Sequence, residues 1–345
     1  MEIIHGGDIY RNHVTLDFSV NVNPLGIPKQ VERALMDAVT ACVRYPDPEA
    51  QELKTATASV LKIEKEQLIF GNGASELFMA VVHAVRPRRT VIPVPSFYGY
   101  EYAAGALEQE MIYYPMKEQN GFRLDADILG VLTEDTDLLF LANPNNPVGN
   151  LIEQDVLRQI LKHCKERKIT VVLDECFIEF ADEKASMLSE IKAYGNLLIV
   201  RAFTKIFAIP GVRIGYLMGS DRELLAKIKR QLPEWNLSAF AQAAGVACAG
   251  EREYIEKTKA YVKTEAKYLL GGLREAGICV FPTKADFLLF YSRLPLYDRL
   301  LEQGILIRDC SNFRGLSKGY YRIAVKSRAE NKVLLDRIGE LIWTE

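Results

Sequence analysis

Residues 138–175, LLFLANPNNPVGNLIEQDVLRQILKHCKERKITVVLDE, carry the pattern that decides the fold. They begin with an uninterrupted apolar run, pass through a loop rich in asparagine and proline, and then follow a helical pattern over Gln154–Arg167. A second apolar run, Val171–Leu173, leads into two acidic residues. Neither run alternates with polar residues, which is typical of strands buried on both faces. Two such strands joined by a helix predict a parallel βαβ unit.

The same alternation of strand and helix patterns extends in both directions from this unit. Helices are expected between the strands, for example at Glu76–Val85 and Tyr98–Leu107. We therefore predict an α/β fold in which a large domain, residues 45–250, has a mostly parallel seven-stranded sheet between helices. The expected strands are Gln67–Phe70, Thr90–Val94, Met111–Tyr114, Leu138–Leu141, Thr170–Leu173, Leu197–Val200 and Ile214–Met218.

The pattern changes after residue 250. A long charged helix is expected over residues 251–276, and a last helix from Ala329 onward. Between them lie expected strands and one short helix, and the first forty or so residues have no place in the βαβ series. We predict a smaller α+β domain built from both chain ends, residues 1–44 and 251–345. Its expected elements are strands at Ile278–Phe281, Phe287–Tyr291, Ile305–Arg308 and Tyr321–Val325, and a helix at Leu296–Gln303.

Composition excludes several classes of protein. The chain of 345 residues has 43 Lys and Arg against 45 Asp and Glu, which gives a net charge of −2. This balance argues against a strongly basic face, so we expect no nucleic-acid or membrane partner. With 49% hydrophobic and 26% charged residues, the chain resembles an ordinary globular protein rather than a disordered one.

The cysteines, histidines and N-terminus bear on cellular location. The six cysteines include no C-x-x-C pair and the four histidines no H-x-x-x-H spacing, so we expect reduced thiols and no metal site. The first eight residues lack the basic and apolar regions of a signal peptide. The uncharged residues 236–250 are too few and too polar to span a bilayer. We therefore expect a cytoplasmic protein.

The segment Gly71–Glu76, between an expected strand and helix, offers a first indication of chemistry. Its glycines allow a tight turn, and Ala74 and Ser75 open the helix with N–H groups that can bind a phosphate. A capped turn without a ligand explains the segment equally well on its own. Glu76 stands where the dinucleotide-binding motif G-x-G-x-x-G needs its third glycine, which argues against a nicotinamide-dependent dehydrogenase.

Three more segments place polar residues after expected strands, where parallel sheets carry functional groups. Asn143–Gly149 reads as a turn when it is taken alone. Asp174 closes a fully apolar strand, which is costly unless a cation lies nearby. Lys205 alone would be a surface residue, but beside a buried acid and Arg213 it becomes a candidate amine for a Schiff base.

Together the four segments match one ligand. They offer N–H groups for a phosphate, an acid for a ring nitrogen, an amide for a ring oxygen and a lysine for an aldehyde, which are the four handles of pyridoxal 5′-phosphate (PLP). The ordered motifs GNGASE, NPNNPVG, DECF and TKIFAIPGVRIG resemble the fold-type I PLP enzymes of the class I and II aminotransferase group. The resemblance extends from about Asp17 to Val325.

The resemblance implies a role for each matching residue. Lys205 would form the Schiff base with the cofactor and later move protons at the substrate Cα. Asp174, the second residue expected to be catalytic, would keep the ring nitrogen protonated, and Asn146 would bind the ring 3′-oxygen. The implied cofactor-binding residues of one chain are Gly73, Ala74, Ser75, Phe97, Asn146, Asp174, Phe177, Thr204, Lys205 and Arg213.

The resemblance also implies a homodimer, because Tyr45 matches a tyrosine that reaches the cofactor phosphate of the neighbouring subunit. Two positions depart from the family's pattern. Phe177 stands where many relatives have a tyrosine that donates to the 3′-oxygen, and Ala202 stands where many have a serine or threonine. Each departure removes one contact with the cofactor.

Two branches of the group stay open. The N-terminal arm and the segment around Arg308 resemble threonine-phosphate decarboxylase, a cobalamin-pathway enzyme, more than histidinol-phosphate aminotransferase. Arg322 matches the arginine that binds the substrate α-carboxylate. Arg308 resembles an arginine that binds a substrate phosphate, although a surface charge at a strand end is the alternative. The implied substrate-binding residues are His5, Ser19, Asn21, Asn146, Arg308 and Arg322.

We therefore expect an enzyme that acts through an external aldimine on an amino acid, with a phosphorylated one favoured. Decarboxylation is the favoured reaction and transamination is the alternative. The outcome depends on which bond at Cα stands perpendicular to the cofactor ring. That orientation changes when the substrate moves by about an ångström, and no sequence motif indicates the position of the substrate so closely.

Overall fold

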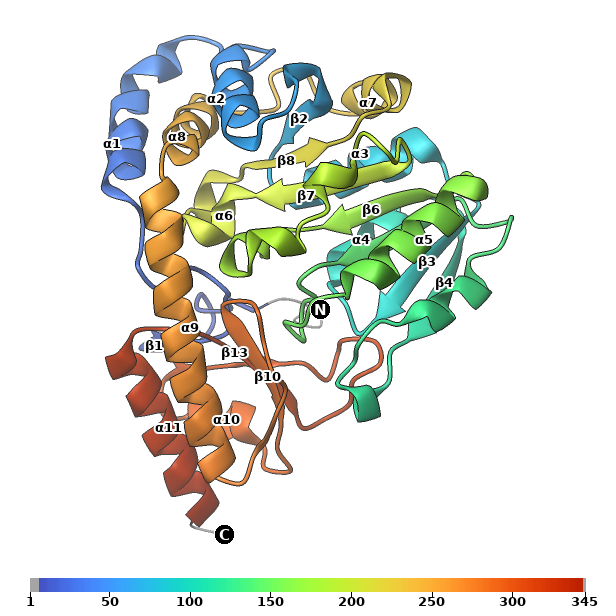
Figure 1. The fold of residues 1–345 in the computed structure, drawn as a ribbon. Helices are drawn as coiled ribbons and strands as arrows, with labels where there is room; N and C mark the ends of the chain where they lie inside the picture. Colours follow the sequence, from blue (N-terminus) through green and yellow to red (C-terminus); the bar gives the residue numbers. More distant parts are fainter. Residues whose placement is uncertain (1–5, 344–345) are drawn as a thin grey trace.

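The computed structural model describes residues 6–343, which form a large α/β part and a smaller α+β part beside it (Figure 1). The large part is built on a seven-stranded sheet with the order β2-β8-β7-β6-β5-β3-β4. Strand β8 runs antiparallel to β2 and β7, and the other neighbours are parallel. The predicted mostly parallel seven-stranded sheet is confirmed. Its strands are β2 (Leu68–Gly71), β3 (Arg89–Val94), β4 (Glu110–Pro115), β5 (Leu138–Ala142), β6 (Thr170–Asp174), β7 (Leu197–Ala202) and β8 (Gly215–Met218).

Helices cover both faces of this sheet, because successive strand residues point to opposite sides. Phe140 of β5 packs into the hydrophobic cluster of one face, and its neighbour Leu139 into that of the other. Burial on both faces explains why the strands read as continuous apolar runs. One face carries α3 (Ala74–Val85), α4 (Tyr98–Ala104) and α7 (Arg222–Lys229), and the other carries α2 (Gln51–Leu61), α5 (Gln154–Glu166) and α8 (Ala239–Ala249).

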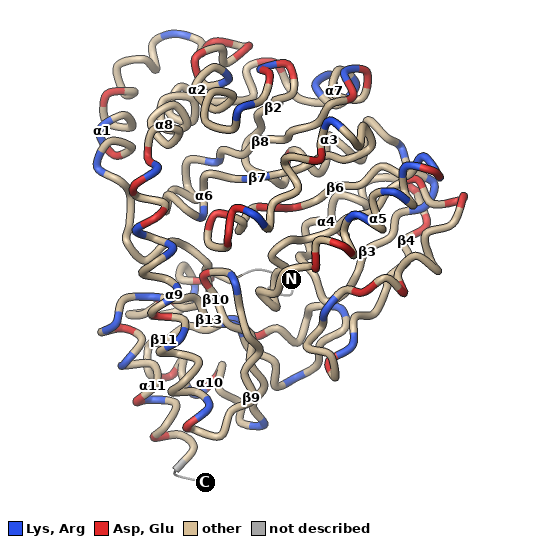
Figure 2. The backbone as a smooth tube through the Cα atoms, in the orientation of Figure 1, with Lys and Arg blue, Asp and Glu red and all other residues tan. Residues whose placement is uncertain are grey.

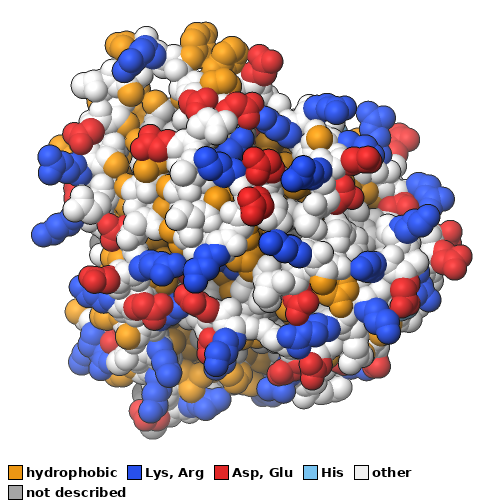
Figure 3. All heavy atoms as spheres, turned by 45° about the horizontal axis from the view of Figure 1, so that its top comes forward, with side chains coloured by type: hydrophobic (Ala, Val, Ile, Leu, Met, Phe, Trp, Pro, Cys, Tyr) orange, Lys and Arg blue, Asp and Glu red, His pale blue; other side chains and the backbone are white. Residues whose placement is uncertain are grey.

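Charged residues lie mainly on the outer helices and loops. Acidic and basic residues are interspersed along the backbone, and the face seen in Figure 3 carries both signs next to each other (Figures 2 and 3). The uncharged residues 236–250 supply the short helix α8. Within residues 6–343, no helix combines the length and the apolar character needed to cross a bilayer.

The smaller part is a four-stranded antiparallel sheet with the order β12-β13-β10-β9. The long helix α9 runs from the large part down along this sheet, and α11 lies beside its lower half (Figure 1). These elements are β9 (Cys279–Val280), β10 (Phe287–Tyr291), β12 (Arg308–Asp309), β13 (Tyr320–Ala324), α9 (Arg252–Glu275), α10 (Leu296–Leu301) and α11 (Arg328–Trp343).

The expected strand Ile305–Arg308 is two strands rather than one. Its first half, β11 (Ile305–Leu306), pairs in parallel with β1 (Leu16–Asp17). Its second half, β12, pairs with β13. The strand pairing therefore changes at Ile307, and one continuous stretch of the sequence contributes strands to two different sheets.

The N-terminal segment contacts both parts of the molecule. Its β1 pairs with β11, and the Ala324 amide of β13 donates to the Phe18 carbonyl at 2.8 Å. Its helix α1 (Lys29–Asp37) instead packs against α8 of the large sheet's covering layer (Figure 1). The division into residues 45–250 and residues 1–44 with 251–345 stays a prediction.

Candidate active site

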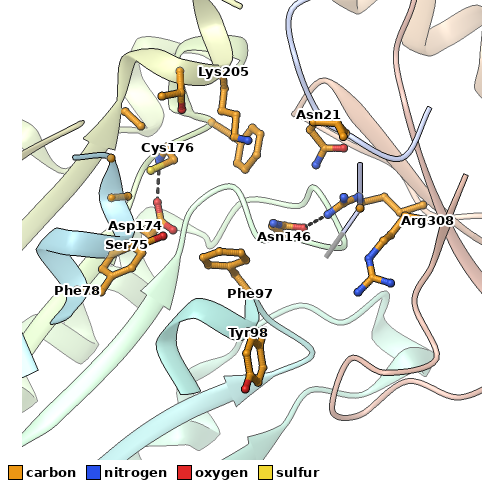
Figure 4. Close-up of a pocket in the computed structure, with 18 of the residues that line it drawn as sticks. Asn21, Ser75, Phe78, Phe97, Tyr98, Asn146, Asp174, Cys176, Lys205 and Arg308 are labelled. Carbon is orange, nitrogen blue, oxygen red and sulfur yellow. Dashed lines mark hydrogen bonds between the residues drawn. The ribbon is translucent and has the colours of Figure 1, made fainter. Parts of the chain in front are cut away.

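The sequence-predicted residues gather around one cavity of about 330 Å³. It lies at the carboxyl ends of β5, β6 and β7, where the smaller part meets the large sheet. The predicted residues that line it are Ser19, Asn21, Gly73, Ala74, Ser75, Phe97, Asn146, Asp174, Phe177, Thr204, Lys205, Arg213, Arg308 and Arg322. Figure 4 shows Asp174 and Ser75 on one side, Asn21 and Arg308 on the other, and Phe97 and Asn146 between them.

Two predicted residues are not in this group. His5 lies outside the described residues. Tyr45 does not line the cavity: its side chain is 82% exposed, and its ring centre lies 5.1 Å from that of Trp235.

Lys205 lies in the short helix α6 (Phe203–Ile206), which begins directly after β7. This turn is held by the N-terminal segment, since the Asn23 amide donates to the Lys205 carbonyl at 3.1 Å. The Asn23 side-chain amide also donates to the Ile206 carbonyl at 2.6 Å. The backbone carbonyls of the lysine and of the residue after it are therefore held in place, and the lysine side chain extends into the cavity (Figure 4).

The charge on Lys205 is set by its surroundings. Burial lowers the pKa of the Lys205 ammonium, and the charges of Arg322 and Arg213 lower it further. Asp286 and Cys176 act in the opposite direction, but the pKa stays below its ordinary value. A lowered pKa increases the fraction of neutral amine, which is the form that attacks an aldehyde.

Asp174 ends β6 with its carboxylate held between two donors. Its Oδ1 accepts from the Cys176 amide at 2.9 Å and its Oδ2 from the Tyr100 hydroxyl at 2.5 Å. Burial raises the pKa of Asp174, and these hydrogen bonds to Cys176 and Tyr100 partly oppose the rise. The carboxylate is thus fixed in position at the cavity wall (Figure 4), where a cationic ligand group would be strongly favoured.

Tyr100 is a functional residue that the sequence reasoning missed. It lies in α4, is 1% exposed, and its ring stacks on Phe140 at 5.1 Å with Phe78 edge-on at 5.1 Å. A buried tyrosine hydroxyl needs a hydrogen-bond partner, and Asp174 is that partner. The position of Tyr100, three residues after Phe97 on the first turn of a helix, was the available signal.

The start of α3 forms a site for an anion. Gly73 has φ of +80°, and a Cβ there would lie 2.6 Å from Nη2 of Arg213, so glycine allows the guanidinium to approach the backbone. Arg213 is oriented by donating to the Pro210 carbonyl at 3.0 Å. The N–H groups of Ala74 and Ser75 at the helix start, together with this guanidinium, are the donors that a phosphate requires.

Arg322 occupies the opposite wall, from β13. Its Nη1 donates to Oδ1 of Asn146, and its Nη2 donates to the Ser19 carbonyl at 3.0 Å. Its buried Nε has no hydrogen-bond partner among residues 6–343. Burial lowers the pKa of Arg322 to about 10. This guanidinium is therefore oriented but not neutralised, as a binding site for a carboxylate would be.

Arg308 of β12 lies directly opposite Arg322 in the antiparallel pair. Cross-strand partners project on the same face of a sheet, and two like charges there are destabilising. Both side chains are 6% exposed and both line the cavity. Arg308 is oriented by a hydrogen bond from its Nη2 to Oδ1 of Asn312 at 2.7 Å. Two buried guanidinium groups in one cavity indicate a ligand with two anionic groups.

A comparison with known protein families identifies the family to which this fold belongs. The model for aminotransferase class I and II matches residues 14–338. The chain belongs to this family. The membership confirms the resemblance that the motifs indicated, and it argues against a nicotinamide-dependent dehydrogenase.

Individual relatives fall into the two expected branches. A threonine-phosphate decarboxylase of Salmonella typhimurium is 36% identical over 96% of this chain and 94% of that protein. The crystal structure of a histidinol-phosphate aminotransferase from Clostridium acetobutylicum has a TM-score of 0.90 and 34% identity, and covers 96% of this chain and all of the other. An L-threonine-O-3-phosphate decarboxylase structure from Porphyromonas gingivalis has a TM-score of 0.84 and 27% identity, over 96% of this chain and 100% of that one.

The protein is a PLP-dependent enzyme, and the residues of the cavity fit the cofactor. The donors around Gly73 suit its phosphate, and the fixed carboxylate of Asp174 suits a protonated ring nitrogen. Lys205, with its lowered pKa, suits the aldehyde. When bound, PLP accepts the electron pair left on the substrate Cα when one of its bonds breaks.

Phe177 contributes to the site through packing, since it has no hydroxyl to donate. Its ring lines the cavity and packs edge-on against Phe287 at 5.1 Å. Ala202, the second departure from the family's pattern, ends β7 and also lines the cavity. Both positions therefore present apolar side chains to the cavity.

Proposed function

We propose that this enzyme decarboxylates a phosphorylated amino acid of the L-threonine O-3-phosphate type. The observation that carries the proposal is the opposed pair Arg308 and Arg322, which offers two buried guanidinium groups to one ligand. L-Threonine O-3-phosphate has an α-carboxylate and a phosphate, one for each group. The threonine-phosphate decarboxylase relative at 36% identity supports the same assignment.

In this proposal the residues of the chain divide the work. Arg322 binds and orients the α-carboxylate, supported by Asn146 and the Ser19 carbonyl. Arg308 binds the phosphate, and Asn21, whose side-chain amide N–H groups can donate to a phosphate oxygen, lies on the same side of the cavity (Figure 4). When the carboxylate has left as CO₂, Lys205 supplies the proton that Cα needs.

Histidinol-phosphate aminotransferase activity is the second candidate, favoured by the structural match at a TM-score of 0.90. Histidinol phosphate has a phosphate but no carboxylate, so it would leave Arg322 without an anionic partner in that half of the reaction. This difference in ligand charge is the reason for placing decarboxylation first.

We also propose that the enzyme is a homodimer in which Tyr45 of each chain completes the partner's phosphate site. Tyr45 is exposed next to Trp235, and the same N-terminal stretch exposes Met36, Val39 and Val43. Apolar side chains gathered on one surface are typical of an interface between subunits. We further infer a cytoplasmic location, since all six cysteines are free thiols.

Product analysis tests the reaction. The purified holoenzyme is incubated with L-threonine O-3-phosphate and released CO₂ is measured, beside a second sample with histidinol phosphate and 2-oxoglutarate in which glutamate is measured. CO₂ release without glutamate formation supports decarboxylation. Glutamate formation without CO₂ release would reverse the assignment, and neither product would exclude both substrates.

A further inference from the structure

Asp286, directly before β10, is a buried acid to which the site described so far gives no role. It is 0% exposed, and neither carboxyl oxygen has a hydrogen-bond partner among residues 6–343. Its backbone is fixed, because the Val325 amide donates to its carbonyl at 2.7 Å. Burial of an ionised carboxylate without donors is strongly unfavourable unless cations face it.

Cationic groups from three segments face Asp286. They are Lys205 of α6, Arg322 of β13, and Lys326, which follows β13. Each lowers the pKa of Asp286, but burial outweighs them and raises it to about 7. Near neutral pH the carboxyl is therefore poised between its two charge states, with the reactive lysine among its neighbours.

The backbone places Asp286 directly behind the wall of the cavity. The next residue, Phe287, packs edge-on against Phe177, and the guanidinium carbon of Arg322 lies 5.4 Å from its ring centre. Phe177 and Arg322 both line the cavity, whereas Asp286 does not. Asp286 therefore has no contact with the ligand and can act on it only through a neighbour.

We propose that Asp286 is a positioning residue whose negative charge acts on Lys205 across the cavity wall and keeps the lysine nitrogen protonated when Cα must receive a proton. The proposal rests on the proposed decarboxylation. In that reaction the bond from Cα to the carboxylate breaks, CO₂ leaves, and the electron pair of the broken bond remains with Cα. The Lys205 N–H then transfers its proton to Cα, which forms the new C–H bond and leaves a neutral amine.

The charges around Lys205 support this role. Burial, Arg322 and Arg213 all favour the neutral amine, and Asp286 is the largest influence that favours the ammonium, followed by Cys176. Transamination needs the opposite start, since a base must first remove the proton from Cα. A carboxylate that stabilises the ammonium therefore favours CO₂ release over amino transfer.

A pH titration of the visible absorbance of the holoenzyme tests the proposal, because this absorbance reports protonation of the Lys205 nitrogen joined to the cofactor. In Asp286→Asn we expect the midpoint to fall by about one pH unit, the usual effect of losing a nearby opposite charge. Asp286→Glu should return the midpoint toward the wild-type value. An unchanged midpoint in Asp286→Asn would show that Asp286 is a neutral structural residue.

Glu179→Gln is the matched control. Glu179 is another carboxyl whose pKa burial raises to about 7, and its Oε2 has no partner in the described chain. Its charged neighbours are Arg201, Glu175 and Lys259 rather than Lys205. The control should keep the wild-type midpoint; an equal shift in both variants would overturn the proposal. If Asp286→Asn does not fold, Asp286→Ser is titrated in its place, with the same expectations.

A second measurement uses the products. If the proton is added to the former aldehyde carbon of the cofactor instead of Cα, hydrolysis by water leaves the amino nitrogen on the cofactor as pyridoxamine phosphate and releases a ketone. The ratio of pyridoxamine phosphate formed to CO₂ released therefore reports which carbon received the proton. A one-unit shift changes the ratio of ammonium to amine tenfold, and we expect this product ratio to rise about tenfold in Asp286→Asn. Wild-type enzyme that releases no CO₂ would reject the proposed function, whereas the absorbance midpoint alone decides whether Asp286 acts on Lys205.

Discussion

Replacement of Tyr100 by phenylalanine should lower both the stability of the fold and the affinity for PLP. The substitution removes only the hydroxyl that donates to Asp174, and the ring can keep its stacking on Phe140. A hydrogen bond to a charged group contributes about 1.5–3 kcal/mol, and its loss leaves Oδ2 of a buried carboxylate without a donor. The cofactor-free fold should lose this amount of stability, and PLP affinity should fall as well, because the carboxylate is then held less firmly in position for the ring nitrogen.

The pH dependence identifies the cause. In the folded protein burial already raises the pKa of Asp174 above its ordinary 3.8, and loss of the hydroxyl raises it further. A carboxyl whose folded pKa is raised destabilises the fold where it is ionised, and this cost disappears as the pH falls through the folded pKa. The cofactor-free variant should therefore be less stable than wild type at pH 8 and approach it at acidic pH.

Urea unfolding of both cofactor-free proteins at several pH values, with PLP titration of each, measures these effects. Tyr102→Phe is the control, because Tyr102 lies in the same helix and is 64% exposed. An equal loss of stability at every pH would show that Tyr100 matters through packing alone. No loss at any pH would refute the reasoning.

Three further changes test other parts of the site. Lys205→Ala should abolish turnover while far-UV circular dichroism stays unchanged, and residual full activity would exclude the lysine as the reactive amine. Arg308→Ala should raise KM for O-phospho-L-threonine roughly tenfold to more than a hundredfold and change kinetics with L-threonine little; an equal loss for both substrates would exclude phosphate binding. Tyr45→Phe should weaken PLP retention. A mixed dimer of this variant with Lys205→Ala should contain one undamaged site, so mixing the two variants should restore activity. A fully active monomer in sedimentation would contradict the shared site.

Much of the fold could be predicted because its strands are buried on both faces. The run Leu138–Leu141 could only be a central strand or part of a buried helix, and the turn-rich loop after it decided between them. The strand Ile305–Arg308 could not be divided correctly, since an apolar run does not record which sheet it pairs with. Pairing between distant segments is a property of the tertiary structure.

The site was predictable where a motif carries several polar residues in a fixed order. Asp174 and Lys205 belong to such motifs and line the same cavity. Tyr100 and Asp286 are single residues in apolar surroundings. The partner of Tyr100 lies 74 positions away in the sequence, and the charged groups around Asp286 lie on separate elements. The opposition of Arg308 and Arg322 likewise depends on strand register, which residue types alone do not determine.

The parts of the site are synthesised in the order of their positions along the chain, and the N-terminal segment is present from the start. The residues that fit PLP lie between residues 73 and 213, and Asn23 already holds the backbone of Lys205. Arg308 and Arg322, and the amide of Ala324 that pairs with Phe18, are added more than ninety residues later. On the ribosome, where the N-terminal part folds first, the chain can therefore assemble its cofactor site before it has made either of the arginines that bind the anionic groups of the substrate.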